Sequence, residues 1–471
     1  MDVQQVNSRV IHEEPDTVYR VETAATDAVS EKNTPAATTT AAAAAAANHQ
    51  DGGQVERQAT ALSGASYEET YPEGGRAAWL VVLGSFFALF SAMGLMNSIA
   101  IFQAYTLDHQ LRGYSEGTVG WIFSIYTFLA FFGGVYFGPI FDKYGPRWLT
   151  VSGAVCVTGS MLAMSFCTEL WHFILSFGIL GGLGTSLIFT PCIAAVGHWF
   201  KARRGFATGL ATCAGGLGGI IFPLLLTDLF ERVGYGWATR ALALICLVCS
   251  SVGVVLVRSR LPPARNATAH PDPRIFRQVP FALATVGIFL LEFSLFIPLA
   301  YISTYAVHVG FGQAYAYHLI PVMNAGSVVG RSLPGYYADV IGAFNTCLLS
   351  VALSLVACLC VWLPLGHTSP GLIVFSLLFG FASGTGIAIA PVCIGRMCKT
   401  QEYGRYYATT YTVVSFACLI GIPIAGSIVQ ANGGQYRELI IFTGCIYIGS
   451  AAFLIWAKAA KLGWNNWLAA Y

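Results

Sequence analysis

Charge is what this sequence has least of. Only 10% of its 471 residues are Asp, Glu, Lys or Arg, whereas 55% are hydrophobic and the mean hydropathy is +0.63. A soluble globular domain carries about 25% charged residues. The composition therefore predicts an integral membrane protein that lies in a lipid bilayer, and we expect no nucleic-acid partner.

The sequence also lacks the motifs of the common cofactor-dependent enzymes. No G-x-x-x-x-G-K-(S/T) segment is present to bind ATP phosphates, and G-x-G fragments such as Gly182-Leu-Gly184 lie inside apolar runs instead of after a strand. No group of His, Cys and Asp has the spacing of metal ligands. Nearly all of the 13 cysteines lie in apolar runs, where they act as small hydrophobic residues. We therefore predict that the protein is not an enzyme and binds no cofactor or metal.

Residues 1–75 differ from the rest of the chain because they are polar, acidic and low in complexity, with a threonine and alanine run at 38–47. Such a segment buries too little apolar surface to fold, which predicts a disordered cytoplasmic tail. It shows no signal peptide with a charged start and a short apolar stretch, so we expect the first membrane span to direct targeting.

Long apolar runs fill the remaining sequence. With about 20 residues for one crossing of the bilayer, twelve spans are expected, six on each side of a basic, proline-rich linker at 258–279. They lie near 77–103, 118–141, 149–167, 172–197, 206–230 and 236–257, and then near 280–307, 315–337, 343–364, 371–395, 405–431 and 438–460. The sequence predicts an all-α membrane protein with two six-helix bundles, at 76–257 and 280–462, and a cytoplasmic C-terminal tail at 463–471.

Basic residues gather in the loops on one side of these spans. Lys143, Arg147, Lys201 and the linker arginines, Arg258 among them, lie on that side, and cytoplasmic loops retain Lys and Arg. We therefore expect both termini and the linker in the cytoplasm, in a multi-pass protein of the plasma membrane.

A polar, glycine-punctuated turn follows the second span of each half. Its glycine lets two helix backbones approach, and its aspartate can face the positive end of a neighbouring helix. We predict that Asp142 and Asp339 hold the two bundles together at the cytoplasmic side; the alternative is a solvated turn between helices. The two copies share one spacing, Gly138-x-x-x-Asp142-x-x-Gly145 and Gly335-x-x-x-Asp339-x-x-Gly342, which indicates two homologous membrane halves.

Twelve spans in two parallel repeats, with this turn in each, resemble the major facilitator superfamily over roughly residues 76–462. The family motif G-x-x-x-D-(R/K)-x-G-(R/K)-(R/K) is matched by Gly138, Asp142, Lys143, Gly145 and Arg147, whereas the second copy has no basic partner. The resemblance implies a carrier of one small organic solute that works by alternating access, with Asp142, Lys143, Arg147 and Asp339 as gating residues.

Two further stretches resemble the monocarboxylate-transporter-like group of that superfamily. They are Pro72-Glu73-Gly74-Gly75 with Ala78-Trp79 before the first span, and the run from Trp199 to Ala211, and the long acidic tail is like that of fungal members. The sequence departs from the proton-coupled lactate carriers of the group in two places. Asn97 stands where the first-span lysine is expected, and Ser327 stands four residues before Arg331, in place of an aspartate.

Two ionisable residues lie deep in the predicted spans. A charge at the bilayer centre costs roughly 2.5 kcal/mol or more, so such residues face a cavity or a partner. Glu292 and Arg331 form either a structural pair that ties adjacent spans together, or a site in which Arg331 contacts an anionic substrate while Glu292 tunes its charge or carries a proton. Asn97, Asn324, Tyr301 and Tyr305 are further candidates for the substrate-binding cavity.

Three functions remain open on the sequence. The first is a carrier of a small organic solute, such as a monocarboxylate-like or other organic anion, with proton coupling through Glu292. The second is an efflux transporter for a fungal secondary metabolite encoded in a biosynthetic gene cluster. The third is a nutrient sensor built on a transporter fold, with the tail as its signalling arm.

Overall fold

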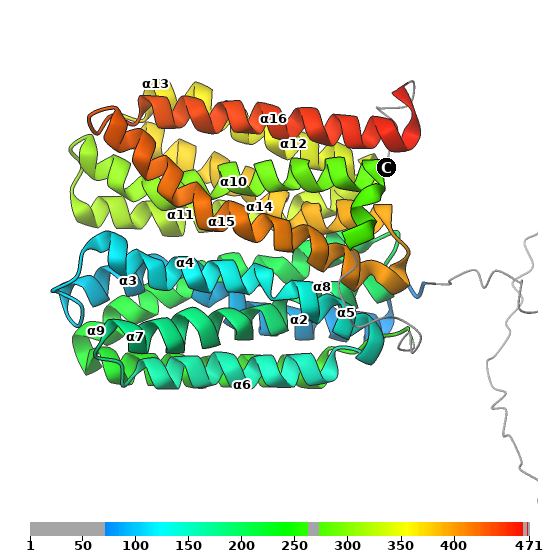
Figure 1. The fold of residues 1–471 in the computed structure, drawn as a ribbon, viewed down its shortest axis with the longest axis horizontal. Helices are drawn as coiled ribbons and strands as arrows, with labels where there is room; N and C mark the ends of the chain where they lie inside the picture. Colours follow the sequence, from blue (N-terminus) through cyan, green and yellow to red (C-terminus); the bar gives the residue numbers. More distant parts are fainter. Residues whose placement is uncertain (1–70, 262–272, 465–468, 470–471) are drawn as a thin grey trace, which may run out of the picture. The chain divides into compact units, whose positions relative to one another are not determined.

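A computed structural model describes residues 71–261, 273–464 and 469. The expected acidic tail, apart from residues 71–75, and the middle of the expected linker lie outside the described residues. Within the described part, helices alternate with short turns and no strand is present (Figure 1). The predicted all-α fold is therefore confirmed.

The N-terminal six spans follow the expected order. Three of them are composed of more than one helical segment, and the fifth and sixth run on as one long helix. The segments are α2 (Gly75–Asn97) and α3 (Ile99–Asp108), α4 (Glu116–Phe132) and α5 (Gly134–Tyr144), α6 (Arg147–Met164), α7 (Leu170–Phe173) with η1 (Ile174–Gly181) and α8 (Gly182–Trp199), and α9 (Arg204–Leu256).

Two breaks in these spans have local causes. Gly234 has a φ of 77°, a conformation that suits glycine, and it divides the 53-residue α9 into the expected fifth and sixth spans. Ser98 interrupts the first span, where its hydroxyl donates to the carbonyl of Gly94 at 2.7 Å. A serine that bonds the preceding turn competes with the helical ladder, which fits a break at this point.

The C-terminal six spans repeat this order. The linker ends in the short helix η2 (Pro273–Arg277), and a second short helix, η4 (Thr400–Glu402), precedes the eleventh span. The spans are α10 (Val279–His308), α11 (Gln313–Ile341), α12 (Ala343–Val356) with η3 (Ala357–Trp362) and α13 (Leu363–Leu365), α14 (Ser369–Met397), α15 (Tyr403–Ala431) and α16 (Arg437–Leu462).

Nine helical stretches of the described chain are long and apolar enough to cross a membrane, and the 53-residue α9 is one of them. The helices α6 and α11 occupy the two remaining expected positions. The apolar character of α11 is reduced by Asn324, Arg331 and Asp339. With α9 counted as two spans, the helices form the twelve predicted spans.

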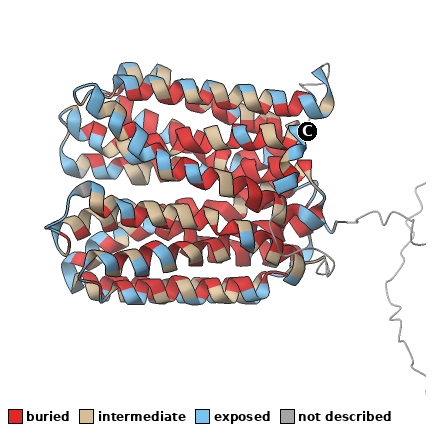
Figure 2. Cartoon of the chain, viewed as in Figure 1, coloured by how far each residue is buried: buried red, intermediate tan, exposed pale blue. Residues whose placement is uncertain are grey.

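The helices lie in two groups, with the N-terminal six spans in one half of the ribbon and the C-terminal six in the other (Figure 1). Each bundle packs its buried side chains inward, while the outer faces of its helices are exposed (Figure 2). These outer faces are apolar: Val155, Leu244 and Leu349 are each more than half exposed, at 67%, 62% and 61%. Such a surface suits lipid and not water.

Candidate functional site

Asp142 joins the two bundles at the end of α5. Its carboxylate, only 6% exposed, accepts hydrogen bonds from the backbone N–H groups of Gly404 (3.1 Å) and Arg405 (2.8 Å) in the first turn of α15. A helix leaves these first-turn donors unsatisfied, and its positive end favours a carboxylate. A Cβ on Gly138 would lie 2.3 Å from the carbonyl oxygen of Gly404, so glycine is required for this approach. We call this contact the first latch.

Asp339 makes the same contact in the opposite direction. Its carboxylate accepts hydrogen bonds from the backbone N–H groups of Gly205 (2.7 Å) and Phe206 (2.9 Å) at the start of α9. A Cβ on Gly335 would lie 2.6 Å from the carbonyl oxygen of Gly205. We call this contact the second latch. The sequence repeat is therefore a repeat of contacts, since the aspartate after the second span of each half caps the fifth span of the other half.

The basic residues of the motif lie beside the first latch in sequence. Lys143 has its ammonium nitrogen 5.5 Å from the ring centroid of Tyr144, and Arg147 is exposed at the start of α6. Neither side chain forms a hydrogen bond or ion pair with another residue that the structure describes. Their role in gating stays a prediction.

Arg204 is a contact residue that the sequence did not single out. It begins α9 and is only 3% exposed, with hydrogen bonds from its guanidinium to the carbonyl oxygens of Gly197 (2.7 Å) and Phe200 (3.2 Å). Its guanidinium carbon lies 4.9 Å from the ring centroid of Tyr403, the first residue of α15. Arg204 therefore joins the bundles by a cation–π contact. In sequence it stands close to Lys201 and Arg203, which are both exposed, so the sequence alone does not distinguish Arg204 from a surface residue.

The two stretches that resemble the monocarboxylate-transporter-like group touch each other. The carboxylate of Glu73 accepts hydrogen bonds from the backbone N–H groups of Lys201 (2.9 Å), Ala202 (2.7 Å) and Arg203 (3.0 Å). Three consecutive N–H groups form an anion-binding concavity that suits a carboxylate. Glu73 thus fixes the loop that leads into α9, the helix on which the second latch is built.

Arg331 lies in the seam between α11 and α9. The residue is 2% exposed, and its guanidinium donates to the carbonyl oxygen of Thr212 (2.9 Å) and to the hydroxyl of Ser327 (3.1 Å). A Cβ on Gly209 would lie 2.1 Å from the backbone oxygen of Arg331. The glycine therefore lets the backbones of the two bundles meet, and Arg331 reaches the interior at their junction.

Two predicted site residues bond carbonyl oxygens on the same face of α9 as Arg331 does. The side-chain amide of Asn97 donates to the carbonyl oxygen of Gly215 (2.8 Å), and that of Asn324 donates to the carbonyl oxygen of Gly219 (3.1 Å). Pro223 has no N–H to give to the carbonyl four residues earlier, which is that of Gly219. Asn324 therefore supplies, from the other bundle, the donor that the helix lacks.

Glu292 is buried in α10 without a bonding partner. It is 2% exposed, and among the described residues no hydrogen bond and no ion pair within 4.0 Å reaches its carboxylate. Arg331, Tyr407 and Tyr411 lie near enough for electrostatic interaction with it. The hydroxyls of both tyrosines are also buried without a partner among the described residues. The direct Glu292–Arg331 pair that the sequence left open is not formed in this structure.

Tyr301 and Tyr305, near the end of α10, contact residues outside that helix. The hydroxyl of Tyr301 donates to the carbonyl oxygen of Ile422 (3.0 Å). The ring of Tyr305 packs edge-on against Trp362 and Tyr436, with ring centroids 5.4 Å apart in each pair. Both tyrosines come after Glu292 in the last third of α10. Their place in the substrate site remains a prediction.

Comparison with known proteins identifies the family. The model of the Major Facilitator Superfamily matches residues 80–367 and 335–466. The chain belongs to this superfamily. It is 37% identical to "MFS-type transporter 1" of Ophiocordyceps sp. over 83% of this chain and 88% of that protein. It is 32% identical to the riboflavin transporter of Saccharomyces cerevisiae, over 84% and 81%, and 34% identical to the aspyridones efflux protein of Emericella nidulans, over 84% and 80%.

A solved structure has the same fold. The human organic anion transporter MFSD10 superimposes with a TM-score of 0.65 at 17% identity, over 80% of this chain and 99% of that chain. The superfamily and the transporter relatives show that this protein is a multi-pass membrane transporter of a small organic solute and not an enzyme. As a superfamily member it has two bundles, and the latches are the hydrogen bonds that close one end of the seam between them.

Proposed function

We propose that this transporter carries an organic anion and that Arg331 contacts its anionic group. The supporting observation is that a buried guanidinium donates only to neutral oxygens, those of Thr212 and Ser327. No described carboxylate lies within 4.0 Å of it. A buried charge needs a partner of opposite sign, and a carboxylate on the solute supplies one in the planar geometry that a guanidinium binds best.

The neighbouring side chains suit a solute with an apolar body. Phe189 and Tyr411 have ring centroids 6.0 Å apart, and Phe131 and Tyr411 5.5 Å apart, so aromatic rings of the N-terminal bundle pack against Tyr411, which interacts electrostatically with Glu292. The unpartnered hydroxyls of Tyr407 and Tyr411 offer hydrogen bonds to polar groups of the solute. We propose an organic anion larger than lactate, bound partly by stacking.

Membership of the monocarboxylate-transporter-like group is the finer proposal. Its support is the contact between Glu73 and the loop at residues 201–203, because this contact joins the two stretches that resemble the group. The substrate chemistry of the lactate carriers is not carried over, since Asn97 donates to a backbone carbonyl and Ser327 bonds Arg331.

We further propose that Glu292 exchanges a proton during transport. A buried carboxylate without a hydrogen-bond donor is costly when ionised, and Arg331 is the cation near it. Binding of an anion at Arg331 removes part of that cation's stabilising field, which favours protonation of Glu292. Uptake driven by an inward proton gradient tests this, and Glu292→Gln is expected to leave transport that no longer responds to the gradient.

The transport proposal is tested in vesicles with purified protein. Uptake of a labelled aromatic carboxylate is measured in competition with lactate, with other carboxylates and with their methyl esters. We expect carboxylates to compete and esters to fail. Arg331→Lys should abolish uptake, whereas Arg112→Lys, a change at an exposed loop arginine, should have no effect. Equal competition by esters and acids would contradict the role of Arg331. Binding without uptake by the wild type would favour the sensor.

Export of a fungal secondary metabolite is the second candidate function. It is favoured by the relative that is named as the aspyridones efflux protein. Orientation by loop charge predicts both termini in the cytoplasm and the latches at the cytoplasmic end. Deletion of the gene is expected to raise the intracellular share of one metabolite, and re-expression of the wild type, but not of Arg331→Lys, should restore its release.

A further inference from the structure

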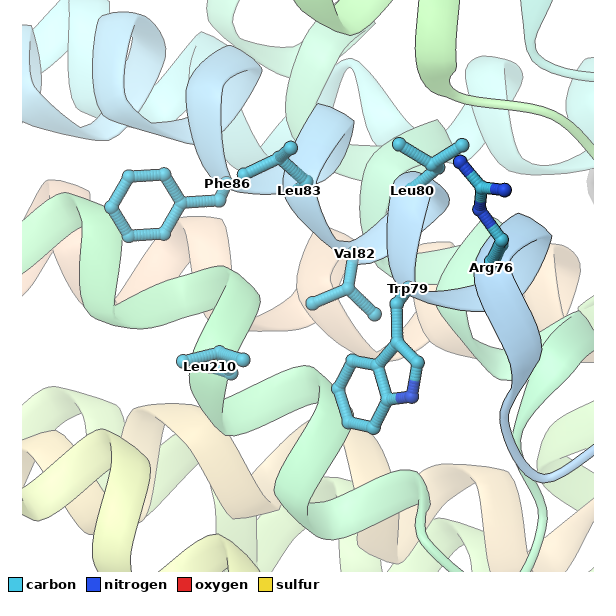
Figure 3. A pocket seen from close by; sticks show the side chains of 7 residues that line it. All are labelled: Arg76, Trp79, Leu80, Val82, Leu83, Phe86 and Leu210. Atoms are coloured by element: carbon cyan, nitrogen blue, oxygen red, sulfur yellow. The ribbon is translucent and has the colours of Figure 1, made fainter.

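A groove of about 550 Å³ runs along the outside of α2 against α9 (Figure 3). Its volume lies within the range of ligand pockets, about 300–1,000 Å³. Its lining is apolar except for one arginine and one indole: Leu80, Val82, Leu83, Phe86 and Leu210 with Arg76 and Trp79. Leu80 and Leu83 are 45% and 46% exposed on a helix that spans the membrane, so this face meets lipid and not water.

The polar atoms of the groove gather at one end. Figure 3 shows Arg76 and the indole nitrogen of Trp79 on one side of the groove and Phe86 and Leu210 on the other. Arg76 is exposed in the first turn of α2, and neither it nor the indole N–H has a hydrogen-bond partner among the described residues. A positive side chain at the positive end of a helix is unfavourable unless an anion lies beside it. The groove thus has one end that suits an anion and an apolar remainder.

We propose that this groove binds one anionic phospholipid, with the phosphate at Arg76 and Trp79 and an acyl chain along Leu83 and Leu210. The loop charges place this end of α2 at the cytoplasmic leaflet, where anionic lipids concentrate. Arginine donates two parallel bonds to phosphate, and tryptophan belongs at the membrane interface. The polar segment at residues 1–70 is a poorer occupant, since its acidic side chains match Arg76 but its large apolar residues stand singly or in pairs, such as Val10-Ile11, and do not match a continuous apolar lining.

The groove is connected to the second latch. The ring of Trp79 packs edge-on against that of Phe206, with the ring centroids 6.1 Å apart. The ring of Phe206 packs in the same way against that of Tyr336 in the other bundle, with the centroids 6.4 Å apart. The backbone N–H of Phe206 also donates to Asp339. A lipid that fixes Trp79 therefore supports the closed second latch, and its loss weakens that latch.

Native mass spectrometry of the full-length protein, titrated with phosphatidylglycerol or phosphatidylcholine, tests the proposal. We expect the wild type to retain one phosphatidylglycerol several times more strongly than phosphatidylcholine. Arg76→Gln should remove this preference, and Leu83→Trp, which fills the groove, should lower the binding of both lipids. Lys461→Gln is the matched control, because it removes one exposed charge at the same predicted membrane face in the other bundle. Equal effects of Arg76→Gln and Lys461→Gln, or no preference in the wild type, would overturn the proposal.

A photoreactive residue in place of Leu83, activated in native membranes, identifies the occupant directly. An adduct with the mass of a phospholipid is the expected result, and Arg76→Gln in the same protein should reduce its yield. An adduct with the chain's own segment 1–70, or with another protein, would contradict the lipid assignment. Because the readout is an adduct and not transport, the result is independent of the solute at Arg331.

Discussion

Asn324 donates its side-chain amide to the carbonyl of Gly219, the carbonyl that Pro223 leaves without its helical donor. The bond crosses the seam between α11 and α9, so a proline in one bundle creates the acceptor for a residue in the other. This relationship gives the two bundles a polar contact far from the latches, on the same face of α9 as Arg331.

Asn324→Ala should therefore destabilise the protein by about 1 kcal/mol, in the range of hydrogen bonds between membrane helices. In a Pro223→Ala background residue 223 regains an N–H for the Gly219 carbonyl, and the same Asn324→Ala change should then cost measurably less. Thermal unfolding in detergent of the wild type, the two single variants and the double variant gives the coupling energy between Asn324 and Pro223. A coupling near zero would show that the amide and the carbonyl do not depend on each other.

Asp142→Asn should slow net transport severalfold while the protein reaches the membrane in normal amount. Asparagine keeps one acceptor oxygen but loses the charge that the positive end of α15 favours. Asp339→Asn should have the same effect at α9, and the double variant should be slower than either single variant. The measurement is initial flux at matched expression. Asp228→Asn, which breaks an exposed pair with Arg232, is the control and should leave flux unchanged.

Unaltered flux in both single latch variants would reduce these aspartates to turn residues. The prediction concerns rate and not only stability, so surface expression and thermal unfolding are measured on the same samples. Transport loss that simply follows loss of folded protein would count against a gating role.

Arg331→Lys should leave the protein folded but without transport, because lysine keeps the charge and loses the planar fork that grips a carboxylate. Arg331→Met alone removes the cation that interacts electrostatically with Glu292, and a buried carboxylate without a nearby cation is costly when ionised, so this variant should be less stable than the wild type. The double change Arg331→Met with Glu292→Gln should recover stability without transport. Measurable uptake by the folded double variant would remove Arg331 from the substrate site.

A tag after Met1 and a second tag after Tyr471 should both resist external protease in intact cells. The basis is the excess of Lys and Arg in the loops on one side of an even number of spans. Permeabilised cells provide the control, in which both tags must become accessible. Cleavage of either tag in intact cells would contradict the predicted orientation, with both latches at the cytoplasmic end.

Most span positions could be predicted because length and hydropathy decide them, although α6 and α11 are not among the helices that meet both criteria. The span expected at 315–337 is the helix Gln313–Ile341, although it contains Pro321, Pro334 and Arg331. Prolines and arginines predict a linker at 258–279, and the structure has the short helix η2 near the end of this segment. The break at Ser98 was missed because one hydroxyl bond, invisible to a hydropathy count, interrupts an apolar run.

The candidate site was predicted only in part. A charged residue in an apolar run is conspicuous, which is why Glu292 and Arg331 were found. Their partners are not conspicuous, because Arg331 bonds a backbone carbonyl of Thr212 and any residue type can provide one. The sequence left open a structural Glu292–Arg331 pair as one of two alternatives, and the structure has no such pair within 4.0 Å. Arg204 was missed for the related reason that burial depends on the opposing Tyr403, which is distant in sequence.

The bonds of Glu73 also set an order on assembly. Glu73 precedes the first helix, but its three donors, at residues 201–203, follow the fourth span. During synthesis these bonds cannot form until four spans have been made and placed in the membrane. The bonds that hold the start of the first helix to enter the bilayer thus come from a much later part of the chain, so an interruption of synthesis before Lys201 leaves Glu73 without its three donors.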